Sequence, residues 1–247
     1  MAYLHCEIFS RTLDMATAFV AILPEEGSLK ECPVVYLLHG LSDNCTGWSR
    51  YTAVERIARE KGAAVIMPEV QRSFYTDMAL GLPYFSYITQ ELPQLCSRMF
   101  GLSGKKEDSF IMGLSMGGYG ALKCALSSPE RYAGCASFSA VTDIAARVRG
   151  SQGMRRREFQ AIFGPALEVP EGARLDALLR CQQGRALPRI LMTCGEQDSL
   201  FAENLRFAAE LQAAGAQPSF HSWPGDHNWA FWDRSVQLAF DFFLGKL

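Results

Sequence analysis

The 247-residue sequence has little excess of either charge, because 24 basic and 26 acidic side chains leave a formal net charge of −2. A chain with this balance lacks the strong positive field that draws proteins to nucleic acid or to anionic membranes. No uninterrupted apolar run approaches the ~20 residues that cross a bilayer. We therefore expect a globular protein whose partner is a small molecule, with no nucleic-acid or membrane binding. The one basic cluster, residues 155–157, is interpreted as a solvated helix face in preference to an anion site.

The eight cysteines lack any Cys-X-X-Cys pair and form no metal-like cluster with histidine. Free thiols in a reducing cytoplasm explain this pattern best, so we expect a cytoplasmic protein without a metal or other cofactor. Residues 15–23 are the only leader-like apolar stretch near the amino terminus. They follow Glu7, Arg11 and Asp14 instead of a basic leader, so we interpret them as a strand.

The spacing of apolar residues predicts an α/β fold. Residues 3–10 and 16–23 are expected to form an antiparallel hairpin at one edge of a sheet. Six later runs of β-type residues alternate with helix-length segments, which is typical of a mostly parallel sheet covered on both faces. The expectation is a single three-layer domain over residues 1–247. The predicted strands are residues 34–38, 63–67, 109–112, 133–138, 190–193 and 218–223, and the predicted helices are residues 53–60, 84–100, 119–127, 200–214 and 229–244.

The alternation breaks down between residues 141 and 189, an arginine-rich segment with two predicted short helices at 155–163 and 174–181. An insertion here is expected to lie above the carboxyl ends of the strands, where α/β sheets bind ligands. It could act as a lid or be a surface decoration, and its composition does not decide between the two.

Residues 113–117 read Gly-Leu-Ser-Met-Gly between a predicted strand and a predicted helix. Strand, Gly-X-Ser-X-Gly and helix in this order are typical of a nucleophile elbow, in which Ser115 stands on a strained turn. The flanking glycines leave room where strand and helix nearly touch, and the helix amino terminus favours a negative charge beside it. The pattern predicts a serine hydrolase.

A serine nucleophile needs a base and an acid that orients the base. His227 is favoured among the four histidines because it lies on a loop between the last strand and the last helix, whereas His5 and His221 fall within strands and His39 suits a loop-shaping role. Asp198, on the loop after residues 190–193, is the predicted acid, although it could instead cap the following helix. Asp226 is disfavoured because it adjoins the base in sequence.

The oxyanion formed during acyl transfer requires two backbone donors. The N–H group of Met116 follows the nucleophile directly, and the N–H group of Leu41 lies on the loop after the strand at 34–38. We expect these two groups to form the oxyanion hole.

These motifs resemble the esterase D group of the α/β-hydrolase family, and within it the bacterial tributyrin esterase branch of small carboxylesterases. The resemblance covers nearly the whole chain and rests on residues 37–40, 113–121, 195–198 and 225–233. It implies hydrolysis of short-chain acyl esters by a serine carboxylesterase, including acetyl or feruloyl esters of plant compounds. It also implies a homo-oligomer.

Three alternatives stay open. S-formylglutathione hydrolases belong to the same group, but they usually carry a cysteine where this chain has Asp43 and tyrosines after the histidine, where it has Asn228 and Trp229. Peptidases and other thioesterases share the whole catalytic arrangement. A binding module of the same fold without catalysis generally loses one of the three catalytic residues, and this sequence has a candidate for each.

Two aromatic residues are candidates for substrate contact. Trp48 follows the oxyanion loop and could form a wall of the acyl pocket, although core packing suits a tryptophan equally well. Tyr75, together with Asp77, lies after the strand at 63–67 and could meet the alcohol part of the substrate.

Overall fold

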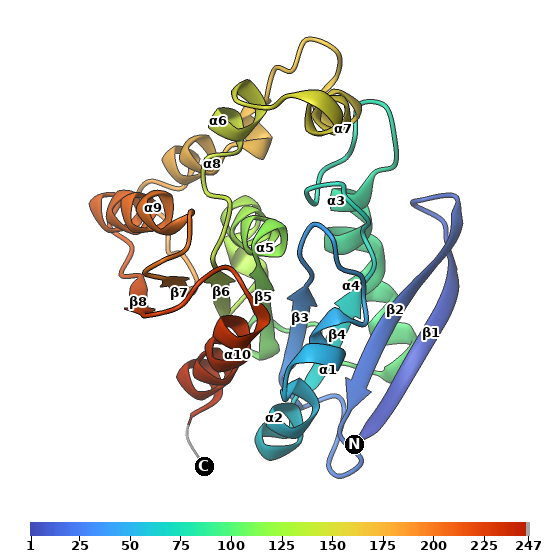
Figure 1. Cartoon of the computed structure of the whole chain (residues 1–247). Coiled ribbons are helices and arrows are strands. Elements are labelled where there is room, and N and C mark those ends of the chain that lie inside the picture. The colour runs from blue at the N-terminus through green and yellow to red at the C-terminus, as the bar shows by residue number, and fades with distance from the viewer. Residues whose placement is uncertain (246–247) are drawn as a thin grey trace.

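Eight strands form one sheet in the order β1-β2-β4-β3-β5-β6-β7-β8 (Figure 1). The structure, a computed structural model, describes residues 1–245. β2 runs antiparallel to both of its neighbours, and all strands from β4 to β8 in that order are parallel. The predicted edge hairpin and mostly parallel sheet are therefore confirmed. The strands are β1 (Ala2–Ser10), β2 (Met15–Leu23), β3 (Val34–Leu38), β4 (Ala64–Pro68), β5 (Ser109–Leu114), β6 (Gly134–Phe138), β7 (Arg189–Gly195) and β8 (Ser219–Trp223).

The five predicted helices outside the insertion are also present, but one of them is divided. The predicted helix at 84–100 consists of α3, the π-helical turn η1 and α4. Glu91, at the end of η1, accepts hydrogen bonds from Ser10 Oγ and from the backbone N–H groups of Arg11 and Thr12, so this turn anchors the β1–β2 hairpin. The helical elements are α1 (Gly47–Tyr51), α2 (Val54–Lys61), α3 (Tyr84–Ser86), η1 (Tyr87–Glu91), α4 (Leu92–Phe100), η2 (Lys106–Asp108), α5 (Met116–Ser127), η3 (Pro129–Arg131), α6 (Ile144–Arg149), α7 (Gly153–Phe163), η4 (Glu171–Ala173), α8 (Leu175–Cys181), α9 (Phe201–Ala213) and α10 (Trp229–Leu244).

Each face of the sheet is covered by its own hydrophobic cluster. Side chains of α1, α2 and α10 pack on one face, and those of α4, α5 and α9 pack on the other. The strands between them are apolar throughout: every residue of β3, β4, β5 and β6 is buried. This is the predicted three-layer α/β sandwich.

The insertion at 141–189 lies above the carboxyl ends of the parallel strands, at the top of Figure 1. The two helices predicted there are α7 and α8, and α6 is an addition. Asp143 caps α6 by accepting a hydrogen bond from the Ala146 N–H group at 2.9 Å.

All eight cysteines are free thiols, and only Cys181 is exposed. In residues 1–245 no helix is long and apolar enough to cross a membrane.

Candidate active site

Ser115 occupies a strained turn between β5 and α5. Its backbone angles, φ 53° and ψ −113°, lie in a region that residues with a Cβ rarely adopt. The turn is held because the Ser115 N–H donates to the Phe138 carbonyl at 2.8 Å and its own carbonyl accepts from the Tyr119 N–H at 3.0 Å. This strained turn therefore directs the Ser115 side chain away from the end of β5.

Gly117 allows α5 to cross closely over the end of β3. A Cβ at this position would meet the carbonyl oxygens of Leu38 and His39, the second at 2.7 Å. Both neighbours are backbone atoms that cannot move without shifting the strand. Because glycine removes this obstacle, α5 starts at Met116, three residues earlier than the sequence pattern predicted.

The structure brings Ser115, His227 and Asp198 into one hydrogen-bonded chain. His227 Nε2 lies 3.0 Å from Ser115 Oγ, and His227 Nδ1 lies 2.8 Å from Asp198 Oδ2. In the tautomer that fits both contacts, Nδ1–H donates to the carboxylate and Nε2 accepts from the hydroxyl. The nucleophile, base and acid predicted from the sequence therefore meet with the geometry that their roles require.

The Asp198 carboxylate is shielded from water but remains ionised. Burial alone would raise its pKa, but hydrogen bonds from His227 and from the Leu200 backbone outweigh burial, so the pKa of Asp198 lies below its ordinary value. The Leu200 N–H donates to Asp198 Oδ1 at 2.9 Å. Asp198 therefore also stabilises the turn before α9, but it is not the N-cap of that helix, a position held by Leu200.

The loops carrying the acid and the base are joined to each other directly. The Gln197 N–H donates to the Gly225 carbonyl at 3.0 Å, and the Gly225 N–H donates to Gln197 Oε1 at 2.6 Å. Asp226 accepts from the backbone N–H of His227 at 2.7 Å and so fixes the loop without touching the ring. The base is thereby positioned against its acid by the backbone as well as by the side chains.

The remaining histidines lie away from this chain of hydrogen bonds. His39 is buried, donates from Nδ1 to the Gly40 carbonyl at 2.7 Å and accepts at Nε2 from the Val70 N–H at 3.2 Å. Burial lowers the pKa of His39, so the ring is neutral and ties two loops together, as its position suggested. His5 and His221 are exposed on β1 and β8.

The two expected oxyanion donors belong to the elements next to Ser115. Met116 is the first residue of α5, and Leu41 follows β3 and lines the same cavity as Ser115 and His227. Within residues 1–245 neither of these backbone N–H groups donates a hydrogen bond to the protein. Arg72 steadies the Leu41 loop by donating to its carbonyl at 3.3 Å.

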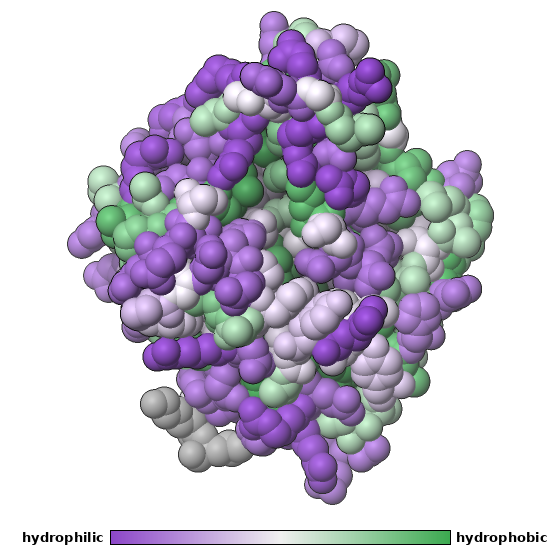
Figure 2. All heavy atoms as spheres, viewed as in Figure 1, coloured by the Kyte–Doolittle hydropathy of each residue, from purple (hydrophilic) through white to green (hydrophobic). Residues whose placement is uncertain are grey.

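A cavity of about 680 Å³ opens above Ser115, and the insertion forms much of its wall. Figure 2 shows the surface hollowed below the insertion, with hydrophobic side chains inside and hydrophilic ones around the opening. Phe74 and Phe159 supply aromatic lining, and their rings lie 5.3 Å apart. The insertion residues in the wall are Val141, Ala146, Arg147, Gly150, Ser151, Gln152, Arg155 and Phe159.

The two aromatic residues proposed from sequence for substrate contact are not in this wall. Trp48 is fully buried, donates from Nε1 to the Leu38 carbonyl at 3.0 Å and packs against Phe138. Tyr75 is also fully buried, and its hydroxyl donates to the His39 carbonyl at 3.0 Å. The prediction of direct contact is wrong for both, because each ring fills the core beneath the oxyanion loop.

The neighbouring candidate Asp77 has a local structural role as well. Its carboxylate accepts hydrogen bonds from the backbone N–H and the hydroxyl of Ser86.

Phe74 was not predicted from the sequence as a substrate-contacting residue, but it lines the cavity and the neighbouring Tyr75 does not. Both residues have positive φ angles, and no sequence signal indicated which of the two side chains would face the cavity.

Comparison with known proteins places the chain in a family. Residues 10–241 match the family described as putative esterase. The chain is 27% identical over 260 residues to an acetyl esterase of Caldicellulosiruptor saccharolyticus, covering 98% of this chain and 97% of that protein. A substrate-bound fluorophosphonate-binding serine hydrolase of Staphylococcus aureus (FphF) is 34% identical, with 99% of both chains covered and a TM-score of 0.93. The apoenzyme of an S-formylglutathione hydrolase (FrmB) from the same organism is 34% identical, with 98% of both chains covered and a TM-score of 0.88.

The family match spans nearly the whole chain, and the structural similarity extends over the entire fold. The chain therefore belongs to the esterase family of the α/β-hydrolase fold and is a serine carboxylesterase.

Proposed function

We propose that the chain hydrolyses short-chain acyl esters through an acyl-enzyme formed on Ser115. The observation that carries this proposal is the 3.0 Å contact between His227 Nε2 and Ser115 Oγ, with Asp198 behind the ring and a cavity in front of the hydroxyl. The same hydroxyl, base and acid at these distances activate a serine in acyl-transfer enzymes on unrelated folds.

In the proposed reaction Ser115 Oγ attacks the ester carbonyl while His227 Nε2 takes its proton. The N–H groups of Leu41 and Met116 stabilise the oxyanion, and the Asp198 carboxylate stabilises the imidazolium. His227 then protonates the departing alcohol, leaving the acyl group on Ser115. Water attacks this ester with His227 as base, and the acid is released with Ser115 regenerated. No metal or cofactor has a place in this scheme.

Several features of the substrate are part of the proposal. The acyl group is short, with acetyl esters first and feruloyl esters of plant-derived compounds second. S-formylglutathione is the second candidate substrate, because a solved protein that is 34% identical over 98% of this chain carries that activity in its name.

We further propose that residues 1–247 act as one domain, with the insertion as a lid over the cavity. We expect the protein to work in the cytoplasm as a homo-oligomer and to bind neither nucleic acid nor membranes.

The test is hydrolysis of p-nitrophenyl esters from acetate to laurate, of methyl ferulate and of S-formylglutathione by the wild type and by Ser115→Ala. We expect a maximum at acetate to butyrate and a loss of at least roughly 10⁴-fold in the variant. Ser199→Ala is the matched control, since Ser199 lines the same cavity but the two ring nitrogens of His227 bond to Asp198 and Ser115 instead, and it should retain activity.

A fluorophosphonate probe separates catalysis from binding alone. Covalent labelling of the wild type but not of Ser115→Ala is expected. A folded wild type that resists the probe and hydrolyses no ester or thioester would refute the enzyme and support the binding module.

A further inference from the structure

The insertion that covers the active site is strongly basic, although the chain as a whole is slightly acidic. Residues 141–189 contain nine arginines, no lysine and five carboxylates, against a formal net charge of −2 for the whole chain. This excess of positive charge lies above the carboxyl ends of the strands, where the cavity opens (Figure 1). A positive field at the mouth of a cavity raises the local concentration of anions.

Two of these arginines form part of the wall beside the nucleophile. Arg147 on α6 and Arg155 on α7 line the cavity that holds Ser115, and among the described residues no carboxylate lines it. The side chains are 43% and 40% exposed, so their remaining N–H groups are open to a ligand. Arg156 and Arg157 are exposed, as the interpretation of residues 155–157 as a solvated helix face expects, whereas Arg155 is half-buried at the cavity wall.

The carboxylates near these arginines neutralise them only in part. Glu158 lies 2.7 Å from Arg155 but also 2.7 Å from Arg72, so one carboxylate is shared between two guanidinium groups. Arg147 lies 3.7 Å from Glu203, beyond a normal hydrogen bond. A net positive charge therefore remains at the cavity wall.

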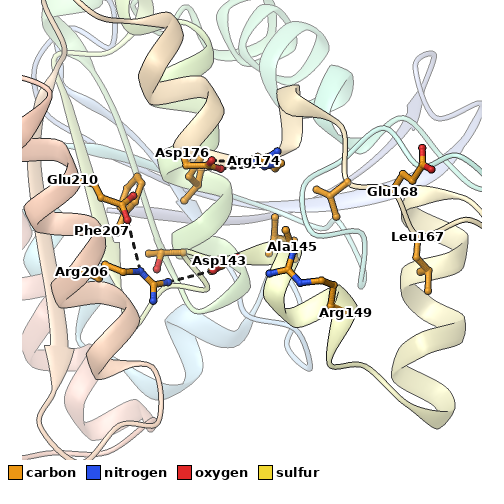
Figure 3. Close-up of a pocket in the computed structure, with 14 residues that line it drawn as sticks. Asp143, Ala145, Arg149, Leu167, Glu168, Arg174, Asp176, Arg206, Phe207 and Glu210 are labelled. Atoms are coloured by element: carbon orange, nitrogen blue, oxygen red, sulfur yellow. Dashed lines mark hydrogen bonds and ion pairs between the residues drawn. The ribbon is translucent and has the colours of Figure 1, made fainter.

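A second cavity of about 570 Å³, on the other side of α6, shows the opposite arrangement (Figure 3). In its wall Arg174 lies 2.6 Å from Asp176, and Arg206 lies 3.3 Å from Asp143. Glu168 and Glu210 add further negative charge, so four carboxylates line this cavity beside the three arginines Arg149, Arg174 and Arg206. An excess of arginine over carboxylate in the wall thus distinguishes the cavity of the nucleophile from this one.

We propose that the preferred ester substrate carries a carboxylate outside its reacting bond, and that Arg147 and Arg155 bind this carboxylate. A guanidinium group presents parallel N–H donors that match the two oxygens of a carboxylate. This inference rests on the proposed esterase function and specifies its substrate class. Because the arginines are partly exposed, the preference weakens as the salt concentration rises.

The test uses two pairs of esters in which a carboxylate outside the reacting bond is present or is blocked as a methyl ester. The first pair, 4-acetoxybenzoate and its methyl ester, places the carboxylate on the leaving group. The second pair, the 4-nitrophenyl monoester of adipic acid and its methyl ester, places it on the acyl group. We expect wild-type kcat/KM to favour the anionic member of at least one pair, and each of Arg147→Gln and Arg155→Gln to reduce that preference about 5-fold, mainly through KM.

Arg156→Gln and Arg157→Gln are the matched controls, because these arginines lie on α7 beside Arg155 but do not line the cavity. They should leave the preference unchanged. Equal kcat/KM for the charged and neutral members of both pairs, or an equal loss in the control variants, would overturn the inference while leaving the esterase intact. Failure of the wild type on the neutral members as well would instead reject the proposed function.

A second inference concerns β1, which with β8 forms the two edges of the sheet within residues 1–245. Three of its apolar side chains are exposed: Tyr3 at 42%, Leu4 at 36% and Phe9 at 65%. An exposed apolar edge strand is a ready partner for another strand. If β1 pairs with β1 of a second copy in an antiparallel manner about a twofold axis, one register places favourable side-chain pairs opposite each other.

In that register the axis passes through Cys6, and all nine residues of β1 pair with those of a second copy. His5 then lies opposite Glu7 of the second copy, and Tyr3 lies opposite Phe9. A shift of the axis to Glu7 or His5 would place like residues opposite each other and shorten the overlap. A polar pair and an aromatic pair facing each other across two strands each stabilise a sheet. We infer that the chain forms a homodimer through β1, with an isologous interface.

Sedimentation equilibrium tests this interface. The wild type should be a dimer, and His5→Glu should shift it toward monomer by placing two carboxylates opposite each other. The double variant His5→Glu, Glu7→Lys should restore the dimer by placing a lysine opposite each new glutamate. Glu130→Lys, on η3, makes the same substitution as Glu7→Lys away from β1, and adding it to His5→Glu should not restore the dimer.

A bismaleimide in a Cys181→Ser background should link two copies through Cys6, and Cys6→Ser should abolish the link. The inference would be overturned by a monomeric wild type, by a dimer that His5→Glu does not weaken, or by a dimer that the bismaleimide does not link through Cys6.

Discussion

Asp198 and His227 are placed in very different surroundings although their side chains touch. The Asp198 side chain is 0% exposed, whereas that of His227 is 33% exposed. The carboxylate thus keeps its charge behind the ring, where water does not screen its attraction for the imidazolium. The lowered pKa of Asp198 ensures that the carboxylate is ionised at neutral pH.

Asp198→Asn should preserve the fold and lose about 10³- to 10⁴-fold in kcat. The asparagine can still accept the hydrogen bond from the Leu200 N–H, but it no longer favours the Nδ1–H tautomer or the imidazolium. Steady-state kinetics on p-nitrophenyl acetate measures the loss. Asp226→Asn is the control, since Asp226 contacts only the backbone of His227, and it should change kcat by less than about 3-fold. A larger loss in kcat for Asp226→Asn than for Asp198→Asn would show that Asp226, and not Asp198, is the acid that orients His227.

The meeting of Ser115, Asp198 and His227 could be predicted from the sequence, because each residue follows a strand of the parallel sheet and these strands end at the same edge. The sequence could not place Trp48 and Tyr75, because an aromatic residue near a catalytic loop can point into the core or into the cavity. That choice depends on contacts with residues distant in sequence, such as the approach of Tyr75 to Gly120 on α5.

The close approach of α5 to the end of β3 depends on a single glycine, Gly117. Gly117→Ala should lower the free energy of unfolding by at least about 2 kcal/mol, because the added methyl group meets backbone carbonyl oxygens of Leu38 and His39. Relief of the clash would move the loop that carries Leu41, so kcat should fall as well. Urea denaturation and kinetics measure the two effects. Gly104→Ala, where nothing lies within 4 Å, should be close to neutral, and equal stability of the two variants would contradict this account.

Lys123 joins α5 to the loop that follows β4. It is 3% exposed, and its ammonium group donates to the Tyr75 carbonyl at 2.9 Å and to Thr76 Oγ1 at 3.0 Å. The ammonium group also lies 4.4 Å from the centre of the Phe85 ring. Burial lowers the pKa of Lys123 from 10.5 to about 8, more than the opposing effects of Cys124 and Asp77 raise it.

Between pH 8 and 10.5 the unfolded chain therefore holds a proton on Lys123 that the folded chain has released. Its contribution to stability rises with pH in this window, by up to about 3 kcal/mol. Buried tyrosines and cysteines with raised pKa values act in the opposite direction, so the informative quantity is the difference between wild type and Lys123→Met. Urea denaturation at pH 7.5 and pH 10 under reducing conditions should show that the wild type gains stability relative to the variant. Lys105→Met, at an exposed position, should follow the wild type.

Long elements with clear periodicity were predictable, whereas short elements without it were not. α1 and α6 span only five and six residues, too few to show a repeat. The π-helical turn at Tyr87–Glu91 was also hidden, because its residues suit an ordinary helix and the tertiary contact of Glu91 with the β1–β2 turn is not visible in local sequence.

The whole molecule is organised around one sheet with a hydrophobic cluster on each face. We expect both clusters to unfold together as a single domain. Leu92→Ala on α4 and Val236→Ala on α10 remove fully buried side chains from opposite faces. Each should lower the free energy of unfolding by roughly 1–4 kcal/mol and shift one common transition. Circular dichroism and fluorescence should give coincident curves in both variants, and two separated transitions would divide the chain into separate units.

The three-layer architecture was predictable because strands buried on both faces are apolar throughout and helices separate them. The position of the insertion wall was not, since loop composition does not specify which side chains turn toward Ser115. Only the folded chain brings α6 and α7, which lie 29 to 48 positions after Ser115 in the sequence, over the nucleophile.

All four tryptophans gather on the side of the molecule that carries the base. Trp229 lies 5.4 Å from Trp48 and 5.3 Å from Trp232, measured between ring centres, and Trp232 lies 4.8 Å from the His227 ring. Trp223 stacks on Phe231 in the first turn of α10, at 4.3 Å. The ultraviolet emission of the protein therefore originates next to its catalytic base. Since a protonated imidazole quenches a neighbouring indole, the enzyme carries its own optical reporter of the charge on His227, and ligand binding can be followed without a dye.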